Sequence, residues 1–406
     1  MNTYMHNLKD TIQQLAKAQH EQIIAIRRHI HAHPELSFQE HKTAQFIATT
    51  LQEHGLAAQT GITDTGLVLH IAGQNPTKRV IALRADMDAL PIQETNKVPY
   101  KSTVNGVMHA CGHDAHTASL IGTAIILDKI KDAFEGTIKL IFQPAEEKSP
   151  GGAIGMIQAG VLKNPAPAAI LAQHVSGDIP AGKLGFVKGP VMANTNELSI
   201  TVHGKAGHAA CPHMAVDPIL IAAHIIVALQ QVVSRHIDPI TPCVLSICKI
   251  DAGTATNIIP EVVHLVGSVR TSNEALRDKV KEKITTIATG IAASMGGSCE
   301  VKLLEGYPAT YNDPALTERT IQAAEEYMGK DQIQPVDLCM AGEDFAYFAQ
   351  AIPGCFYFLG VQNKSMGIDS WVHTPTFNID EEVLAFAPGL MAWLAIQELQ
   401  HGGGGS

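Results

Sequence analysis

The sequence predicts an α/β protein with a mixed, mainly parallel sheet and helices on both of its faces, interrupted by a smaller α+β domain. Two observations favour this class. Short apolar, β-rich runs alternate with helical runs in residues 1–186, and the pattern changes between 187 and 303. Strands alternating with helices are typical of parallel sheets covered by helices. The 406 residues, 46% of them hydrophobic, are enough for two or three domains with sizeable cores.

The first segment opens with helical patterns. Apolar residues at helical spacing predict a helix over 8–31, which Pro34 ends, and a second helix over 39–54, which Gly55 follows. Short apolar runs then predict four strands, with one helix between the second and the third. These strands are 66–72, 80–84, 136–143 and 168–174, and the helix is 115–130.

The middle segment predicts two helices on a four-stranded antiparallel sheet. Its strands are 197–203, 244–250, 262–271 and 299–304, and its helices are 217–236 and 275–294. A helix at 314–328, a buried-type strand at 355–359 and a closing helix at 381–399 then complete the first domain.

We therefore expect a discontinuous catalytic domain and an inserted lid or dimerisation domain. The catalytic domain takes 1–186 and 304–401, and the inserted domain takes 187–303. Residues 402–406, GGGGS, have the composition of a linker or tag remnant and are excluded from the fold.

Composition excludes several classes of function. A formal net charge of −10 disfavours nucleic-acid binding, which depends on Lys and Arg neutralising phosphates. We expect no membrane span, because the best apolar run, 218–229, is short and carries His224. The N-terminus lacks a signal-peptide pattern, so we expect a cytoplasmic protein. Seven Cys without a CxxC pair argue against a disulfide framework.

Polar residues that can carry chemistry follow the predicted strands. Open α/β sheets bind ligands at the carboxyl ends of their strands. Four clusters occur there, namely Asp86 with Asp88; the run His109–His116, which contains Cys111 and His113; Glu146 with Glu147; and His174.

These clusters favour a metal site. Thiolate and imidazole ligands suit zinc and its neighbours in the first-row series, and Gly112 allows Cys111 and His113 to approach one point. Of the adjacent carboxylates Glu146 and Glu147, one can bind metal while the other does acid–base work. Cys111 could instead be a thiolate nucleophile, but the surrounding imidazoles and carboxylates outnumber what a Cys–His pair needs. The usual serine-elbow, HExxH, P-loop and dinucleotide motifs are absent from the sequence.

The motifs together resemble the M20 metallopeptidases. The similarity is strongest to the branch of bacterial amidohydrolases and plant auxin-conjugate hydrolases that cleave N-acyl amino acids, and it extends from about His29 to Leu399. The motifs are RADMDALP (84–91), HACGHDAH (109–116), QPAEE (143–147), QHVSG (173–177), HGKAGHAA (203–210), TNIIPE (256–261), AGEDF (341–345) and HTPTF (373–377).

The resemblance implies a site for two divalent metal ions in each subunit. Zinc or manganese is expected, and cobalt and nickel remain alternatives. The implied ligands, among which Cys111 can bridge the two ions, are Cys111, His113, Glu147, His174 and His373.

The resemblance also implies the roles of five further residues. Glu146 is the general base, and Asp88 orients a metal-bound histidine. His208 reaches across a homodimer, formed through the lid, and polarises the scissile carbonyl, whereas Asn257 and Arg270 hold the substrate carboxylate. The implied reaction is hydrolysis of a small N-acyl amino acid. Two alternatives remain, a dipeptidase or carboxypeptidase of the same family and, more remotely, a non-catalytic metal-binding relative.

Overall fold

The computed structural model describes residues 3–401 and confirms the predicted fold class. The linker expected at 402–406 lies outside the described residues. The chain divides into two compact units. The first consists of residues up to Val191, Tyr311–Asp337 and the chain from Asp344 onwards, and the second consists of Met192–Thr310 and Leu338–Glu343.

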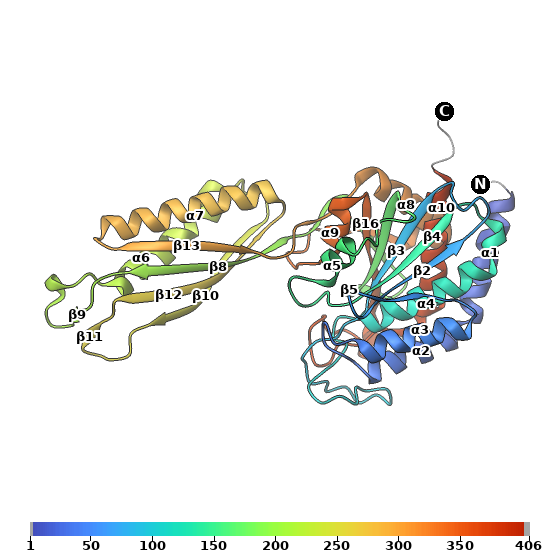
Figure 1. Ribbon diagram of the computed structural model, residues 1–406, viewed down its shortest axis with the longest axis horizontal. Coiled ribbons are helices and arrows are strands. Elements are labelled where there is room, and N and C mark those ends of the chain that lie inside the picture. The colour runs from blue at the N-terminus through green and yellow to red at the C-terminus, as the bar shows by residue number, and fades with distance from the viewer. Residues whose placement is uncertain (1–2, 402–406) are drawn as a thin grey trace. The chain divides into compact units, whose positions relative to one another are not determined.

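The first unit is built on an eight-stranded mixed sheet (Figure 1). In spatial order the strands are β1 (Gln59–Ile62), β2 (Gly66–Ala72), β4 (Thr137–Gln143), β3 (Val80–Asp86), β5 (Ala169–Pro180), β16 (Gly354–Gln362), β6 (Leu184–Phe186) and β15 (Ile333–Pro335). Pairs β3–β4, β3–β5, β5–β16 and β6–β15 are parallel, whereas β1–β2, β2–β4 and β6–β16 are antiparallel.

Helices cover both faces of this sheet (Figure 1). The central strands β3 and β4 are buried along their whole length, as expected for strands between two helical layers. The helices α4 (His113–Lys129) and α10 (Ala387–Gln400) pack together on one face, and α5 (Gly152–Gln158) and α9 (Phe345–Ala351) lie on the other. The remaining helices are α1 (Thr3–Ala18), α2 (His20–Ala32), α3 (His41–Glu53) and α8 (Pro314–Met328).

Two expected helices differ from the structure. The pattern over 8–31 forms two helices, because the chain breaks at Gln19, whose side-chain amide donates to the carbonyl of Gly122. The closing helix begins at Ala387 rather than at 381. Pro388 has no backbone N–H and fits only in a first helical turn, so the preceding residues form a separate 3-10 turn.

The second unit has α6 (Pro218–Gln231) and α7 (Glu274–Ser294) on one face of a four-stranded antiparallel sheet (Figure 1). Asp217 and Asn273 cap the starts of these helices by accepting backbone N–H groups. The sheet order is β10 (Cys243–Ala252), β12 (Val262–Thr271), β8 (Asn194–His203) and β13 (Ser298–Glu305). A separate two-residue ladder joins β9 (Gly207–His208) to β11 (Ile258–Ile259).

The second unit begins at Met192 and ends at Thr310, where the sequence analysis expected 187 and 303. It also includes Leu338–Glu343, which was expected in the first domain. This segment joins the second unit because Ala193 donates its N–H to the carbonyl of Cys339. Short strands β7 (Gly189–Met192) and β14 (Thr310–Asn312) pair where the chain passes from one unit to the other.

One helical stretch, Pro218–His236, is long and apolar enough to cross a membrane by length and composition, although the sequence analysis expected none. The stretch reaches this length because a π-helical segment continues α6 to His236. Ile221, Ile225 and Leu229 of this stretch are buried in the core of the second unit, whereas Leu220 and Val227 are exposed.

Candidate active site

The five expected metal ligands lie together in the first unit. They form two groups, and within each group the ligand atoms lie within 4.8 Å of one another. The first group is Cys111, His113 and His174, and the second is Cys111, Glu147 and His373. Cys111 belongs to both groups, so the two groups share one thiol.

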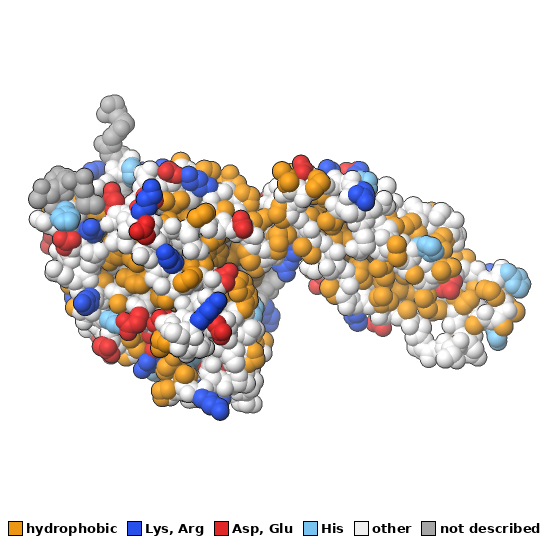
Figure 2. Space-filling view, turned by 180° about the vertical axis from the view of Figure 1, so that it is seen from behind, with side chains coloured by type: hydrophobic (Ala, Val, Ile, Leu, Met, Phe, Trp, Pro, Cys, Tyr) orange, Lys and Arg blue, Asp and Glu red, His pale blue; other side chains and the backbone are white. Residues whose placement is uncertain are grey.

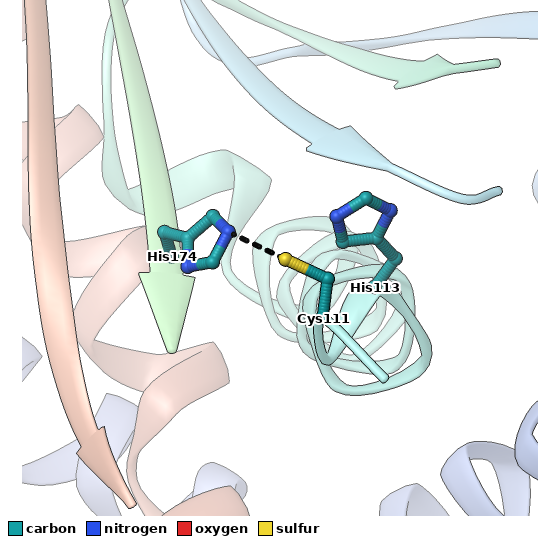
Figure 3. A group of neighbouring side chains, drawn as sticks. All are labelled: Cys111, His113 and His174. Carbon is teal, nitrogen blue, oxygen red and sulfur yellow. Dashed lines mark hydrogen bonds between the residues drawn. The ribbon is translucent and has the colours of Figure 1, made fainter. Parts of the chain in front are cut away.

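Figure 3 shows the first group, in which the start of α4 and the strand β5 bring their side chains together. Cys111 precedes α4, His113 is the first residue of α4, and His174 lies on β5. The Cys111 Sγ is 3.4 Å from the His174 Nε2. Gly112 makes the turn with φ +83°, and a Cβ there would lie 2.3 Å from a methyl carbon of Val175. Only glycine therefore allows Cys111 and His113 to converge.

Hydrogen bonds set the tautomers of both histidines in this group. His174 donates its Nδ1–H to the carbonyl of Val175 at 2.7 Å, and His113 donates its Nδ1–H to the Asp88 carboxylate at 3.2 Å. In the neutral form of each ring, the Nε2 therefore carries a lone pair. The His113 Nε2 is buried and makes no hydrogen bond. A ring nitrogen with a free lone pair is suited to bind a metal ion. The carboxylate or carbonyl that accepts the Nδ1–H of the same ring fixes the orientation of that ring.

The second group joins two distant parts of the chain. The His373 Nε2 lies 3.1 Å from the Glu147 Oε1. The backbone of His373 has φ +61°, a conformation that non-glycine residues rarely adopt, and its N–H donates to the carbonyl of Ala110 at 2.7 Å. This bond fastens the C-terminal segment to the loop that carries Cys111.

The electrostatics of the site favour a cation. Burial, reinforced by Glu147 and Glu146, raises the pKa of the Cys111 thiol well above its usual value. Burial alone would lower the pKa of His113, but the carboxylates of Asp86, Asp88 and Glu147 outweigh it and raise the pKa to about 10. A thiol in such a negative environment is a poor free nucleophile, whereas a metal ion can displace its proton.

Asp88 organises the residues around the site. Its carboxylate accepts the backbone N–H groups of Glu146 at 3.1 Å and Glu147 at 3.0 Å, together with the Ser37 hydroxyl at 2.6 Å. Burial alone would raise the pKa of Asp88, but the bonds from His113, Ser37 and Glu147 lower it. One carboxylate thus fixes both the His113 ring and the segment that carries Glu146 and Glu147.

Sequence reasoning left several residues near the site without a role, among them His116, Ser37 and Glu40. His116 uses both ring nitrogens, since it donates to Asp86 at 2.6 Å and accepts the N–H of Val175 at 2.8 Å. It therefore fixes the strand that carries His174 and is not free to bind metal. Ser37 and Glu40 also contact the site. They follow the segment 33–36, HPEL, and no local pattern indicates that this segment lies near the candidate ligands.

The other three expected site residues lie in the second unit. His208 on β9 pairs with Ile258 on β11, and Ala209 donates its N–H to the carbonyl of Asn257. His208 is exposed, and its Nδ1 accepts the N–H of Ala210 at 3.0 Å. The Nε2 therefore carries the proton and is available to donate to a carbonyl oxygen.

Arg270 lies on β12, in the four-stranded sheet rather than in the β9–β11 ladder. Strand β12 has 10 residues, and Asn257 lies five residues before its first residue, Val262, whereas Arg270 is next to its last. At about 3.3 Å per residue, the two ends are roughly 25–30 Å apart. Asn257 and Arg270 of one chain therefore cannot both contact the carboxylate of one small substrate.

Known proteins match the chain along most of its length. A model of peptidase family M20/M25/M40 matches residues 82–396. Thermostable carboxypeptidase 2 of Saccharolobus solfataricus is 42% identical over 378 residues, which cover 92% of this chain and 95% of that protein. The N-acyl-L-amino acid amidohydrolase of Geobacillus stearothermophilus is 45% identical over 304 residues, which cover 75% of this chain and 81% of that protein.

A solved structure agrees with these matches. The YXEP protein of Bacillus subtilis, described as a dinuclear metal binding peptidase from the M20 family, is 38% identical with a TM-score of 0.81, and the match covers 95% of this chain and 99% of that one. The protein is therefore a hydrolase of amide or peptide bonds. With the family model matched over most of its length and relatives above 40% identity, the chain belongs to peptidase family M20/M25/M40.

Proposed function

We propose that the protein hydrolyses the amide bond of N-acyl amino acids, releasing the acyl group as an acid and a free amino acid. The observation that carries the proposal is the sharing of Cys111 between two three-ligand groups, with Glu146 beside them. A relative 45% identical to this chain has an N-acyl-L-amino acid amidohydrolase name, which supports the substrate class.

The donor set fits two divalent cations. It combines one thiolate with imidazole and carboxylate groups, which suits zinc and also admits manganese, cobalt or nickel. Such cations, when bound, lower the pKa of a coordinated water and polarise the substrate carbonyl. Cys111, His113 and His174 would hold one cation, and Cys111, Glu147 and His373 the other.

Glu146 is the proposed general base. It is buried, and its carboxylate lies within 4.8 Å of the ligand atoms of His113 and Glu147. In this position it takes a proton from the attacking water and passes it to the leaving amine. His208 donates its Nε2–H to the carbonyl oxygen, where negative charge develops.

The substitution Glu146→Gln tests this function. It removes the base but keeps the shape of the side chain, so we expect kcat on N-acetyl and N-benzoyl amino acids to fall by about 10²–10⁴-fold. Metal content, measured by mass spectrometry, should stay at the wild-type level. The control is Glu53→Gln, an exposed position on α3, which should be fully active. A fully active Glu146→Gln enzyme would contradict the assignment.

A carboxypeptidase or dipeptidase is the second candidate, because a relative 42% identical to this chain has a carboxypeptidase name. The two candidates share the site and differ in the group on the substrate nitrogen. Comparing kcat/KM for N-acyl amino acids with that for dipeptides and longer peptides separates them. A protein that binds no divalent cation at neutral pH would instead be the more remote alternative, a non-catalytic relative.

We propose that the working form is a homodimer built through the second unit. Exposed apolar side chains of this unit include Leu220, Val227 and Ile240, and Figure 2 shows apolar side chains gathered on its surface. Asn257 precedes the start of β12 and Arg270 lies near its end, and this separation also fits a site in which two chains contribute one residue each. The seven free cysteines fit a reducing, cytoplasmic location.

A further inference from the structure

The segment that carries Glu146 and Glu147 begins with a strained residue. Ala145 has φ +54° and is fully buried. Residues with a Cβ adopt this left-handed conformation only at a cost in free energy, so the surroundings must hold it. If Ala145 adopted a negative φ, the side chains of Glu146 and Glu147 would turn away from their present directions.

A buried carboxylate holds Ala145 in this conformation. The Glu40 Oε1 accepts the Ala145 N–H at 2.8 Å and the Phe38 N–H at 2.9 Å, and its Oε2 accepts the Thr65 hydroxyl at 3.0 Å. Phe38 is also left-handed, with φ +66°. One carboxylate oxygen thus binds the amides of two residues in the same rare conformation. The Glu40 side chain is fully buried, so water does not compete for these bonds.

Two carboxylates together bind three consecutive amides. Ala145 donates to Glu40, and Glu146 and Glu147 donate to Asp88. Successive N–H groups around a left-handed residue form a concave nest that binds anionic oxygens. This arrangement allows Glu146 and Glu147, although adjacent, to take separate roles. Asp88 also contacts the ligand His113, whereas the hydrogen bonds of Glu40 go to no proposed ligand.

We propose that Glu40 is a positioning residue, which places the general base Glu146 and the ligand Glu147 by holding Ala145 in the left-handed conformation. The effect of Glu40 on turnover rests on the proposed function, but its effect on metal binding does not. The test therefore measures Co²⁺ affinity by calorimetry as well as kcat.

The first variants remove or keep the acceptor. Glu40→Ala deletes it, and we expect Co²⁺ affinity and kcat each to fall by about 10–100-fold, as for other groups that orient metal ligands. Glu40→Gln keeps an oxygen that can accept both amides, so it should stay within a few-fold of wild type. Glu40→Asp keeps the charge but shortens the reach, so it should show the loss even if Glu40→Ala does not fold.

A rescue experiment separates positioning from general stability. Glycine adopts φ +54° without steric cost, so adding Ala145→Gly to Glu40→Ala or Glu40→Asp should restore most of the Co²⁺ affinity and kcat. The matched control is Phe38→Gly, which relieves the other left-handed residue and should restore neither quantity.

The proposal is overturned if Glu40→Ala and Glu40→Asp keep wild-type Co²⁺ affinity. It is also overturned if Phe38→Gly rescues as well as Ala145→Gly, or if Ala145→Gly raises the melting temperature without restoring Co²⁺ affinity. A wild-type enzyme that cleaves no N-acyl amino acid would instead contradict the proposed function and leave the Co²⁺ measurements valid.

Discussion

Cys111 and Cys355 are both buried thiols whose pKa values burial raises, that of Cys355 to about 12. They differ in their neighbours. Cys111 lies among imidazole and carboxylate groups, whereas Cys355 lies on β16 beside the hydroxyls of Thr317 and Thr320. Burial and a high pKa are therefore shared, and only the surroundings of Cys111 make it a candidate ligand.

Replacing each of these cysteines by serine tests this difference. Cys111→Ser should lower metal content and remove the near-ultraviolet absorption band that a Co²⁺-substituted thiolate site shows, because both ligand groups use this sulfur. Cys355→Ser should keep the metal content and the band. Equal metal content in the two variants would exclude Cys111 as a ligand. The absorption spectrum of the Co²⁺-loaded proteins is the measurement.

At the scale of single residues, the sequence predicts the groups with chemical character but not those with unusual backbone geometry. Cys111 and His113 were identifiable because glycine stands between them and histidines surround them. Glu40 was not identifiable, because its contact with Ala145 spans 105 residues and nothing about an alanine indicates a positive φ. Its partners depend on the tertiary fold.

At the scale of a secondary-structure element, the contacts of Lys139 also depend on the tertiary fold. It lies in the fully buried strand β4, and its ammonium donates to the carbonyls of Val161, Lys163 and Pro165. These bonds hold the connection between α5 and β5 against the sheet. Burial lowers the pKa of Lys139 to about 8.

This shift predicts a stability that depends on pH. Because the folded-state pKa, about 8, is below the unfolded value of 10.5, the unfolded chain binds more protons between these two pH values. The free energy of unfolding of the wild type, compared with that of Lys139→Met, should therefore increase between pH 8 and pH 10. The increase should be at most about 3 kcal/mol. Urea unfolding of both proteins at pH 7.5 and 10 measures this difference. A constant difference would show that Lys139 titrates normally.

Element boundaries follow the sequence where local signals are sufficient. The helix expected at 314–328 has the observed bounds, since Asp313 caps it and Pro314 stands in its first turn. The break at Gln19 could not be predicted, because the side chain that marks it bonds to Gly122 on a different helix. Local periodicity thus identifies a helix, whereas tertiary contacts decide where a long one divides.

At the scale of the whole molecule, the proposed donor to the carbonyl and the metal ligands belong to different units. If His208 acts in the partner's site, a dimer of Glu146→Gln with His208→Ala contains one complete site. Each variant alone should be inactive, and a random mixture formed by co-expression should regain about a quarter of the wild-type activity.

A second pair of variants provides the control for this complementation. Glu146 and Glu147 both lie in the first unit, so co-expression of Glu146→Gln with Glu147→Ala leaves a defect in every site and should restore nothing. Activity that stays absent in isolated heterodimers of Glu146→Gln with His208→Ala would show that His208 does not act across the interface.

The discontinuous architecture could be predicted because the hydrophobic pattern changes near 187 and reverts after 303. The assignment of Leu338–Glu343 to the second unit could not. That segment is short and has no periodicity, and its contact with Ala193 forms only when two distant parts of the chain meet.

The position of β16 between β5 and β6 has a consequence for synthesis of the chain. A ribosome completes β5 at residue 180 but does not begin β16 until residue 354. Throughout that interval the edge of β5 has backbone donors and acceptors with no strand to pair with. Unpaired edges of this kind associate with other chains. Slowing translation after residue 180 should therefore increase aggregation of the newly made protein, and factors that shield nascent chains should reduce it.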